Sequence, residues 1–216
     1  MRNRYSQQLA QLDRDLIAMG GMCETSIALA QQALFKDESL VGRLDEMDMA
    51  IHQQEDGIEK LCLQLLLQQQ PVAGDLRIIS AALKMITDME RIGHQAADMG
   101  EIIAAGHIRV ADDRLGLKPM ALAAATMVTA SIDAFVRRDL PAASQVIADD
   151  ETLDAYFIRV QDALAVSLAA APDAGRRILD LLLIAKYFER IGDHAVNIAQ
   201  WVVFSITGEH KDGDIS

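Results

Sequence analysis

The sequence predicts an all-α protein made of two tandem, pseudo-symmetric bundles of three long helices, each bundle running up, down and up. Three observations carry this prediction: an internal repeat, long stretches of helical apolar periodicity, and prolines only where helices can begin or end. Val and Ile do not alternate with polar residues over any useful length, which argues against strands.

The internal repeat spans about half of the chain. The tetrapeptide Glu-Arg-Ile-Gly at residues 90–93 recurs letter for letter at residues 189–192, an offset of 189 − 90 = 99. Upstream, the stretch 48–52 matches 150–154 at an offset of 150 − 48 = 102. A unit of this length is too long for a solenoid repeat and fits a duplicated small domain.

The helices are bounded by prolines and by breaks in the apolar pattern. Proline lacks a backbone N–H and clashes with the preceding turn, so it belongs at helix ends or in first turns. Two prolines separate the second and third helices of each half, and two fall in the first turns of the fourth and fifth helices: Pro71, Pro172, Pro119 and Pro141. The predicted helices cover roughly residues 5–37, 40–69, 74–105, 117–138, 141–170 and 174–207. The first three form a bundle within residues 1–108, and the last three form a second bundle within 109–216.

Composition and charge limit the function classes. The chain is 51% hydrophobic but only 4% aromatic, which suits a large aliphatic core between helices. A net charge of −12 disfavours nucleic acid and anionic lipid as partners and favours cations or a basic protein surface. Cys23 and Cys62 lack a disulfide-framework spacing and no apolar signal core begins the chain, so we expect a cytoplasmic protein with reduced thiols. No apolar run approaches the roughly 18 residues needed to cross a bilayer, so direct membrane insertion is not expected.

Acidic side chains lie on the border of the apolar face in the third and sixth predicted helices. At 100° per residue, Glu90, His94 and Asp98 climb this border in steps of about 40°. Glu189 and Asp193 occupy the same border in the second half. Residues four apart are neighbours on one helix face, about 6 Å between Cβ atoms, so each pair can converge on one ion.

The second helix of each half supplies matching pairs, again four residues apart. Two facing helices that each carry such a pair can bring four oxygen or nitrogen donors to one point, as in the metal sites of helical bundles. The candidate metal ligands are therefore Asp48, His52, Glu90, His94, Asp98, Asp150, Asp154, Glu189 and Asp193. The alternative is a solvated acidic face, or neutralisation by Arg91 and Arg190. Arg91 lies about 100° from Glu90 on the wheel, which makes an intrahelical salt bridge awkward.

Residue type constrains the metal. The carboxylate set of the second half favours hard ions such as Mg, Mn or Fe, whereas His52 and His94 make the first half better suited to Zn, Ni or Fe. His194 points about 100° away from Asp193 and is expected at the surface. A Walker loop, a GxGxxG motif, a zinc-finger cysteine pair and a credible Ser/His/Asp arrangement are all absent from the sequence.

The chain resembles the PhoU family along nearly its whole length, through residues 63–77, 88–93 and 188–198. The resemblance implies two three-helix bundles side by side and, in some members, metal clusters at Glu/Asp-x-x-x-Asp motifs. It also implies a non-enzymatic, often dimeric regulator that works with the ATPase subunit of the phosphate ABC transporter and with the membrane histidine kinase that senses phosphate limitation. Such a regulator holds the phosphate-starvation response off when phosphate is plentiful. His52 and His94 replace the family's aspartates, which suggests retuned coordination.

Three other interpretations stay open on the sequence. A di-metal helical-bundle enzyme would need an open coordination position and a substrate pocket. A purely structural dimerisation module would need none of the paired acids. An accessory protein of a different anion transporter would share the fold and differ in its partners.

Overall fold

The computed structural model describes residues 2–68, 73–110 and 113–209. Within these ranges the chain forms six α-helices and two 3-10 turns, without a strand. The helices are α1 (Arg2–Phe35), α2 (Gly42–Gln68), α3 (Ala73–Gly106), α4 (Leu117–Arg137), α5 (Leu140–Ala170) and α6 (Gly175–Thr207). The predicted all-α class and six long helices are confirmed. Pro71 and its predicted role lie outside the described residues.

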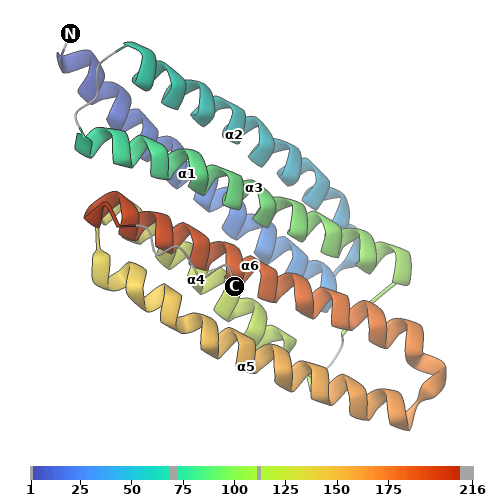
Figure 1. Ribbon diagram of the computed structural model, residues 1–216. Helices are drawn as coiled ribbons and strands as arrows, with labels where there is room; N and C mark the ends of the chain where they lie inside the picture. The colour runs from blue at the N-terminus through green and yellow to red at the C-terminus, as the bar shows by residue number, and fades with distance from the viewer. Residues whose placement is uncertain (1, 69–72, 111–112, 210–216) are drawn as a thin grey trace.

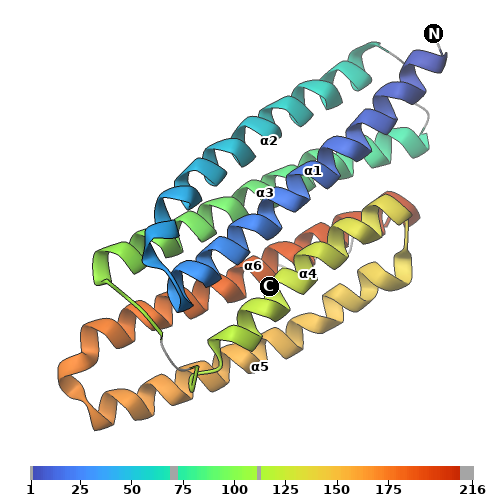
Figure 2. The same cartoon turned by 180° about the vertical axis from the view of Figure 1, so that it is seen from behind.

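The six helices form two three-helix bundles that lie side by side (Figures 1 and 2). One bundle contains α1, α2 and α3, and the other contains α4, α5 and α6. The bundles meet where α3 packs against α6 and where α1 packs against α4. This arrangement leaves α2 and α5 on the outer sides and places the repeated tetrapeptides on the two central helices.

The structure departs from the predicted boundaries at two short 3-10 turns. The first, Glu38–Val41, precedes α2, and the second, Pro172–Ala174, precedes α6. The Asp37 carboxylate accepts a hydrogen bond from the backbone N–H of Ser39 at 3.0 Å, and this local turn delays the α-helix. Asp139 caps α5 more simply, since its Oδ1 accepts from the backbone N–H of Ala142 at 3.0 Å.

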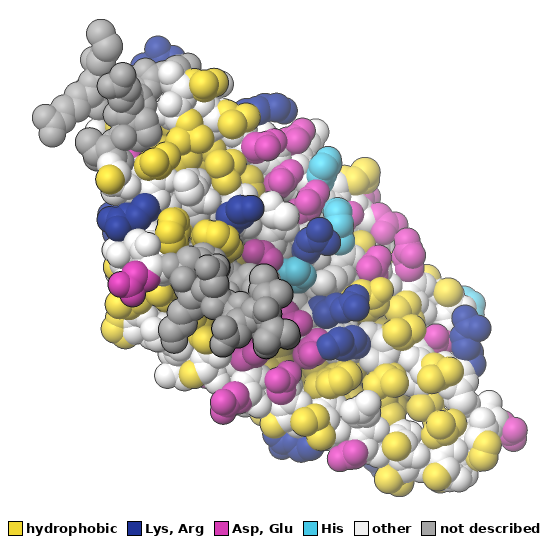
Figure 3. All heavy atoms as spheres, viewed as in Figure 1, with side chains coloured by type: hydrophobic (Ala, Val, Ile, Leu, Met, Phe, Trp, Pro, Cys, Tyr) yellow, Lys and Arg dark blue, Asp and Glu magenta, His cyan; other side chains and the backbone are white. Residues whose placement is uncertain are grey.

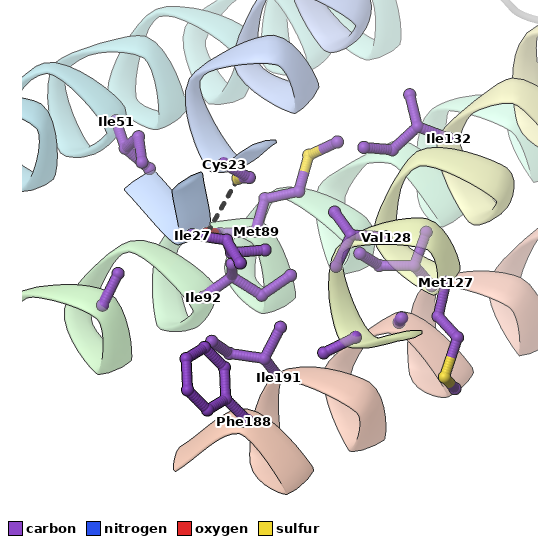
Figure 4. Close-up of a cluster of buried hydrophobic side chains, with 14 of the residues drawn as sticks. Cys23, Ile27, Ile51, Met89, Ile92, Met127, Val128, Ile132, Phe188 and Ile191 are labelled. Carbon is purple, nitrogen blue, oxygen red and sulfur yellow. Dashed lines mark hydrogen bonds between the residues drawn. The ribbon is translucent and has the colours of Figure 1, made fainter. Parts of the chain in front are cut away.

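The hydrophobic core runs continuously through both bundles. The close-up in Figure 4 shows side chains from the two halves meeting in a single cluster. Fully buried members come from α1, α3 and α6, among them Ile27, Met89, Ile92, Phe188 and Ile191. Burial of this shared apolar surface is the main force that holds the two bundles together.

The repeated glycine of the tetrapeptide marks a close approach between helices in each half. A Cβ on Gly93 would lie 2.9 Å from Ile51 Cδ1 of α2, and one on Gly192 would collide with Leu153 of α5. Ile51 and Leu153 are themselves equivalent in the repeat, since 153 − 51 = 102. Glycine at this position therefore lets α2 lie directly on α3, and α5 on α6, which brings the acidic pairs of the two helices face to face.

Helix α4 is a core helix of the second bundle. By length and apolar composition alone, α4 would suffice for a membrane span. The expectation that no stretch of the chain approaches a span is therefore wrong for this helix. Half of its apolar segment is nevertheless buried inside the protein. It packs against α1, α5 and α6. A Cβ on Gly20 of α1 would lie 2.6 Å from Ile132 Cδ1 of α4, whereas one on Gly21 would meet nothing within 4 Å. Gly20 is therefore a close-packing point between the bundles.

Candidate metal centre

The acidic pairs of α2 and α3 meet in the first half. His52 Nδ1 lies 2.6 Å from Glu90 Oε1, and His94 Nδ1 lies 2.5 Å from Asp48 Oδ1. His94 Nε2 lies 3.8 Å from the same Glu90 oxygen. Glu90 is only 19% exposed, whereas the His52 side chain is 60% exposed. The four residues therefore form one cluster at the water boundary, with Glu90 as its least accessible member.

Glu55 joins this cluster and was missed by the sequence analysis. The ligand atoms of His52, Glu55 and Glu90 all lie within 4.8 Å of one another. Burial raises the pKa of Glu55, and the nearby Glu90 carboxylate raises it further. Glu55 follows His52 by three residues, so the two side chains lie on the same face of α2. This i,i+3 spacing is the sequence signal for Glu55, and pairs spaced by four residues do not include it.

The histidines fix the chemistry of the first cluster. The hydrogen bond to Glu90 raises the pKa of His52, and the charge of the same carboxylate acts in the same direction. Asp48 holds His94 through the Nδ1 atom of the imidazole. The Nε2 atom of His94 therefore faces Glu90 and can act as a metal ligand. The imidazoles of His52 and His94 and the carboxylates of Glu55 and Glu90 are donors that fit a transition-metal ion such as Zn, Fe or Ni.

Asp98 lies apart from this cluster. A residue four positions further along a helix is rotated by about 40°, so Asp98 is turned about 80° from Glu90 and toward α6. There it meets the phenol of Tyr187. Burial raises the pKa of this phenol, and the negative charge of Asp98 and its hydrogen bond with the phenol raise the pKa further. Asp98 thus contacts the second bundle rather than the other candidate ligands.

The second-half acids also face one another across α5 and α6. Burial raises the pKa of Asp193 to about 6, the charges of Glu189 and Asp150 add to this rise, and Lys186 opposes it. The pKa of Asp150 is raised by burial and then by Asp154 and Glu189. Lys186 Nζ lies 2.5 Å from Glu189 Oε2. In the described part of the chain these acids do not bring three ligand atoms within 4.8 Å of one another.

His194 lies between the bundles, so its predicted surface position is wrong. Its side chain is 15% exposed, its Nδ1 lies 2.8 Å from Asp88 Oδ1, and its Nε2 lies 3.0 Å from Gln95 Nε2. Asn197 also donates to Asp88, at 3.1 Å. Gln95 and His194 are equivalent in the repeat, since 194 − 95 = 99, so this contact sits at the pseudo-twofold axis. His194 is turned by about 100° from Asp193 around α6, and in this direction its side chain points at α3.

The repeated arginines line a cavity between the bundles. Arg91 and Arg190 border a cavity of about 540 Å³ that also reaches Asp48, His94 and Asp98. Among the described residues, Glu90 pairs with His52 and His94 and forms no ion pair with Arg91. Figure 3 shows acidic, basic and histidine side chains across the middle of this face, with hydrophobic side chains gathered toward both ends.

Comparison with known proteins gives a consistent result over both halves. A family model described as PhoU domain matches residues 16–103 and again residues 117–202. The phosphate-specific transport system accessory protein PhoU homolog of Pseudomonas aeruginosa is 31% identical over 95% of this chain and 86% of that protein. The homolog from Clostridium acetobutylicum is 30% identical over 98% of each chain.

Solved structures agree with this comparison. The crystal structure of PhoU from Pseudomonas aeruginosa matches with a TM-score of 0.89 at 30% identity, covering 95% of this chain and all of that one. The phosphate transport system regulatory protein PhoU from Streptococcus pneumoniae matches with a TM-score of 0.87 at 23% identity, covering 97% of this chain, and supports the fold alone.

Proposed function

Because the chain belongs to the PhoU domain family, we propose that it is a non-enzymatic accessory and regulatory protein of phosphate-specific transport. The observation that carries this proposal is the family match in both halves, together with relatives of that name that align over nearly the full chain. The function belongs to the complete pair of bundles, since their shared core makes them one folded unit.

The proposed mechanism is that of an adaptor. The protein contacts the ATPase subunit of a phosphate ABC transporter and a phosphate-sensing membrane histidine kinase, and keeps the phosphate-starvation response off when phosphate is plentiful. It acts in the cytoplasm as a homodimer and reaches the inner face of the membrane through these partners. The net charge of −12 supports binding to basic protein surfaces rather than to nucleic acid.

The first cluster is proposed to bind a divalent or trivalent metal ion. His52, Glu55, Glu90 and His94 Nε2 are the ligands, and Asp48 is a positioning residue that orients His94. A bound ion would tie α2 to α3 and would offset the repulsion between Glu55 and Glu90. The second-half acids, Asp150, Asp154, Glu189 and Asp193, offer oxygens suited to Mg, Mn or Fe, but Lys186 already supplies a positive charge there.

A pull-down tests the adaptor proposal. The immobilised chain is exposed to the purified transporter ATPase subunit and to the cytoplasmic part of the kinase, with metal content measured in parallel. We expect both partners to be retained by the wild type. A His52→Gln, His94→Gln double variant should lose the metal and weaken retention. His107→Gln is the matched control, because His107 pairs with Glu38 and lies outside the cluster.

The outcomes separate the parts of the proposal. Retention of neither partner by the metal-loaded wild type would remove the adaptor function, whereas equal retention by the double variant would remove only the role of the metal. The cavity beside His94 is what a di-metal enzyme would also require. Phosphatase and oxidase assays on the metal-loaded protein should therefore show no turnover, and turnover that is lost in the double variant would replace the adaptor by an enzyme.

A further inference from the structure

The internal repeat allows the two acidic clusters to be compared position by position. Glu90 corresponds to Glu189, and Asp48 corresponds to Asp150. Four other pairs differ in kind. His52 becomes Asp154 and His94 becomes Asp193 at these offsets, Thr87 becomes Lys186, since 186 − 87 = 99, and Glu55 becomes Phe157, since 157 − 55 = 102. The second half has therefore gained an ammonium and two carboxylates, and it has lost both imidazoles and the carboxylate of Glu55.

The exchanges that place Lys186 and Phe157 in the second half act together in the structure. Lys186 Nζ lies 2.5 Å from Glu189 Oε2, and the Glu189 side chain is only 13% exposed. The same ammonium lies 5.4 Å from the centroid of the Phe157 ring, within the range of a cation–π interaction. The charge of Lys186 also reaches Asp193, two turns further along α6. The ammonium is thus held between the acids on one side and an aromatic face on the other.

We infer that the second half carries its cation covalently: the Lys186 ammonium occupies the position among the acids that a metal ion takes in the first half. Metal binding is then confined to the cluster built around Glu90, and Lys186 with Phe157 are the residues that determine this difference. The inference rests on the metal site of the proposed function.

The physical reason is competition between a tethered and a free cation. Lys186 belongs to the same helix as Glu189, three residues away, so its effective concentration at the carboxylate is set by the chain and not by the solution. A metal ion entering the second cluster would have to displace the ammonium or bind beside it against charge repulsion. In the first half Thr87 carries no charge, and an imidazole of His52 or His94 that gives up its proton can offer a nitrogen lone pair to a metal.

A reciprocal exchange between the halves tests this inference. Lys186→Thr installs the first-half residue in the second half, and Thr87→Lys installs the second-half residue in the first. Thr87 is exposed and precedes Glu90 by three residues, so the new lysine can reach Glu90 as Lys186 reaches Glu189. Each variant is stripped with chelator, titrated with zinc chloride or manganese chloride, and measured for bound metal per chain and for the shift in thermal unfolding.

We expect Lys186→Thr to double the metal bound per chain, and Thr87→Lys to lose most of it. Lys186→Met repeats the first test without the threonine hydroxyl, and circular dichroism verifies the helical fold of every variant. The inference is overturned if neither Lys186 variant gains metal, or if Asp150→Asn with Asp154→Asn lowers the metal content of an otherwise wild-type chain. A wild type without metal, paired with a Lys186→Thr variant that binds it, would instead remove the proposed first-half site and leave the blocking role of Lys186 standing.

Discussion

Replacing Asp193 by asparagine should stabilise the metal-free protein at neutral pH and leave it unchanged in acid. The folded state raises the pKa of this carboxyl from 3.8 to about 6, through burial and then through the charges of Glu189 and Asp150. A folded pKa above the unfolded one means that the folded protein binds the proton more tightly. The ionised carboxylate therefore opposes folding, and this cost grows as the pH rises from about 4 through about 6.

The size of the effect follows from the shift. A rise of about two pKa units corresponds to about 3 kcal/mol at most, since each unit is worth about 1.4 kcal/mol. Asp193 is only partly buried and keeps much of its surface in contact with solvent, so screening reduces the expected cost to about 1 kcal/mol. Asparagine keeps the shape of the side chain and removes the charge. The free energy of unfolding should then increase by about 1 kcal/mol above about pH 7, and by close to nothing at about pH 4.

Urea unfolding in the presence of chelator, at several pH values across this range, measures the effect. Asp162→Asn is the matched control, because it removes one negative charge from an exposed position of α5. Stabilisation of equal size in both variants would assign the effect to net charge. A loss of stability in Asp193→Asn at neutral pH would refute the claim that the second cluster is electrostatically strained.

Two further predictions concern packing and burial. Gly192→Ala should lower the free energy of unfolding by about 1–2 kcal/mol, because the new Cβ collides with the buried Leu153. Gly21→Ala should raise it by about 1 kcal/mol in the same urea titration, since that position is open and alanine favours the helix. Burial raises the pKa of the Cys23 and Cys62 thiols to about 12, so both should react with a thiol reagent at pH 8 only after unfolding. Rapid labelling of the native protein would contradict this burial.

Much of the fold could be predicted because its signals are local. Helix ends follow from proline, glycine and capping residues a few positions away, and the two bundles follow from the repeated sequence. Pairs such as Asp48 with His52 are spaced by the geometry of a single helix, so their shared face was also predictable. The repeated glycine carried a further signal, because a residue without a side chain on an apolar seam marks a close helix contact.

The partners of these side chains could not be predicted in the same way. Glu55, Asp98 and His194 were missed or misplaced because their contacts depend on how each helix is rotated against its neighbours. A helical wheel gives the angle between two residues of one helix, but it does not say which neighbouring helix lies in that direction. With two bundles packed together, a side chain that points away from one core points into the other interface.

The sequence by itself determined that the chain is helical and duplicated and that acidic and histidine side chains line the inner edges of its helices, because hydrophobic periodicity and i,i+4 spacing are properties of consecutive residues. Only the tertiary structure decided which cation meets which carboxylate: imidazoles around Glu90 and the Lys186 ammonium beside Glu189. That choice arises where helices distant in the sequence come within a few ångströms, and no spacing along one helix encodes it.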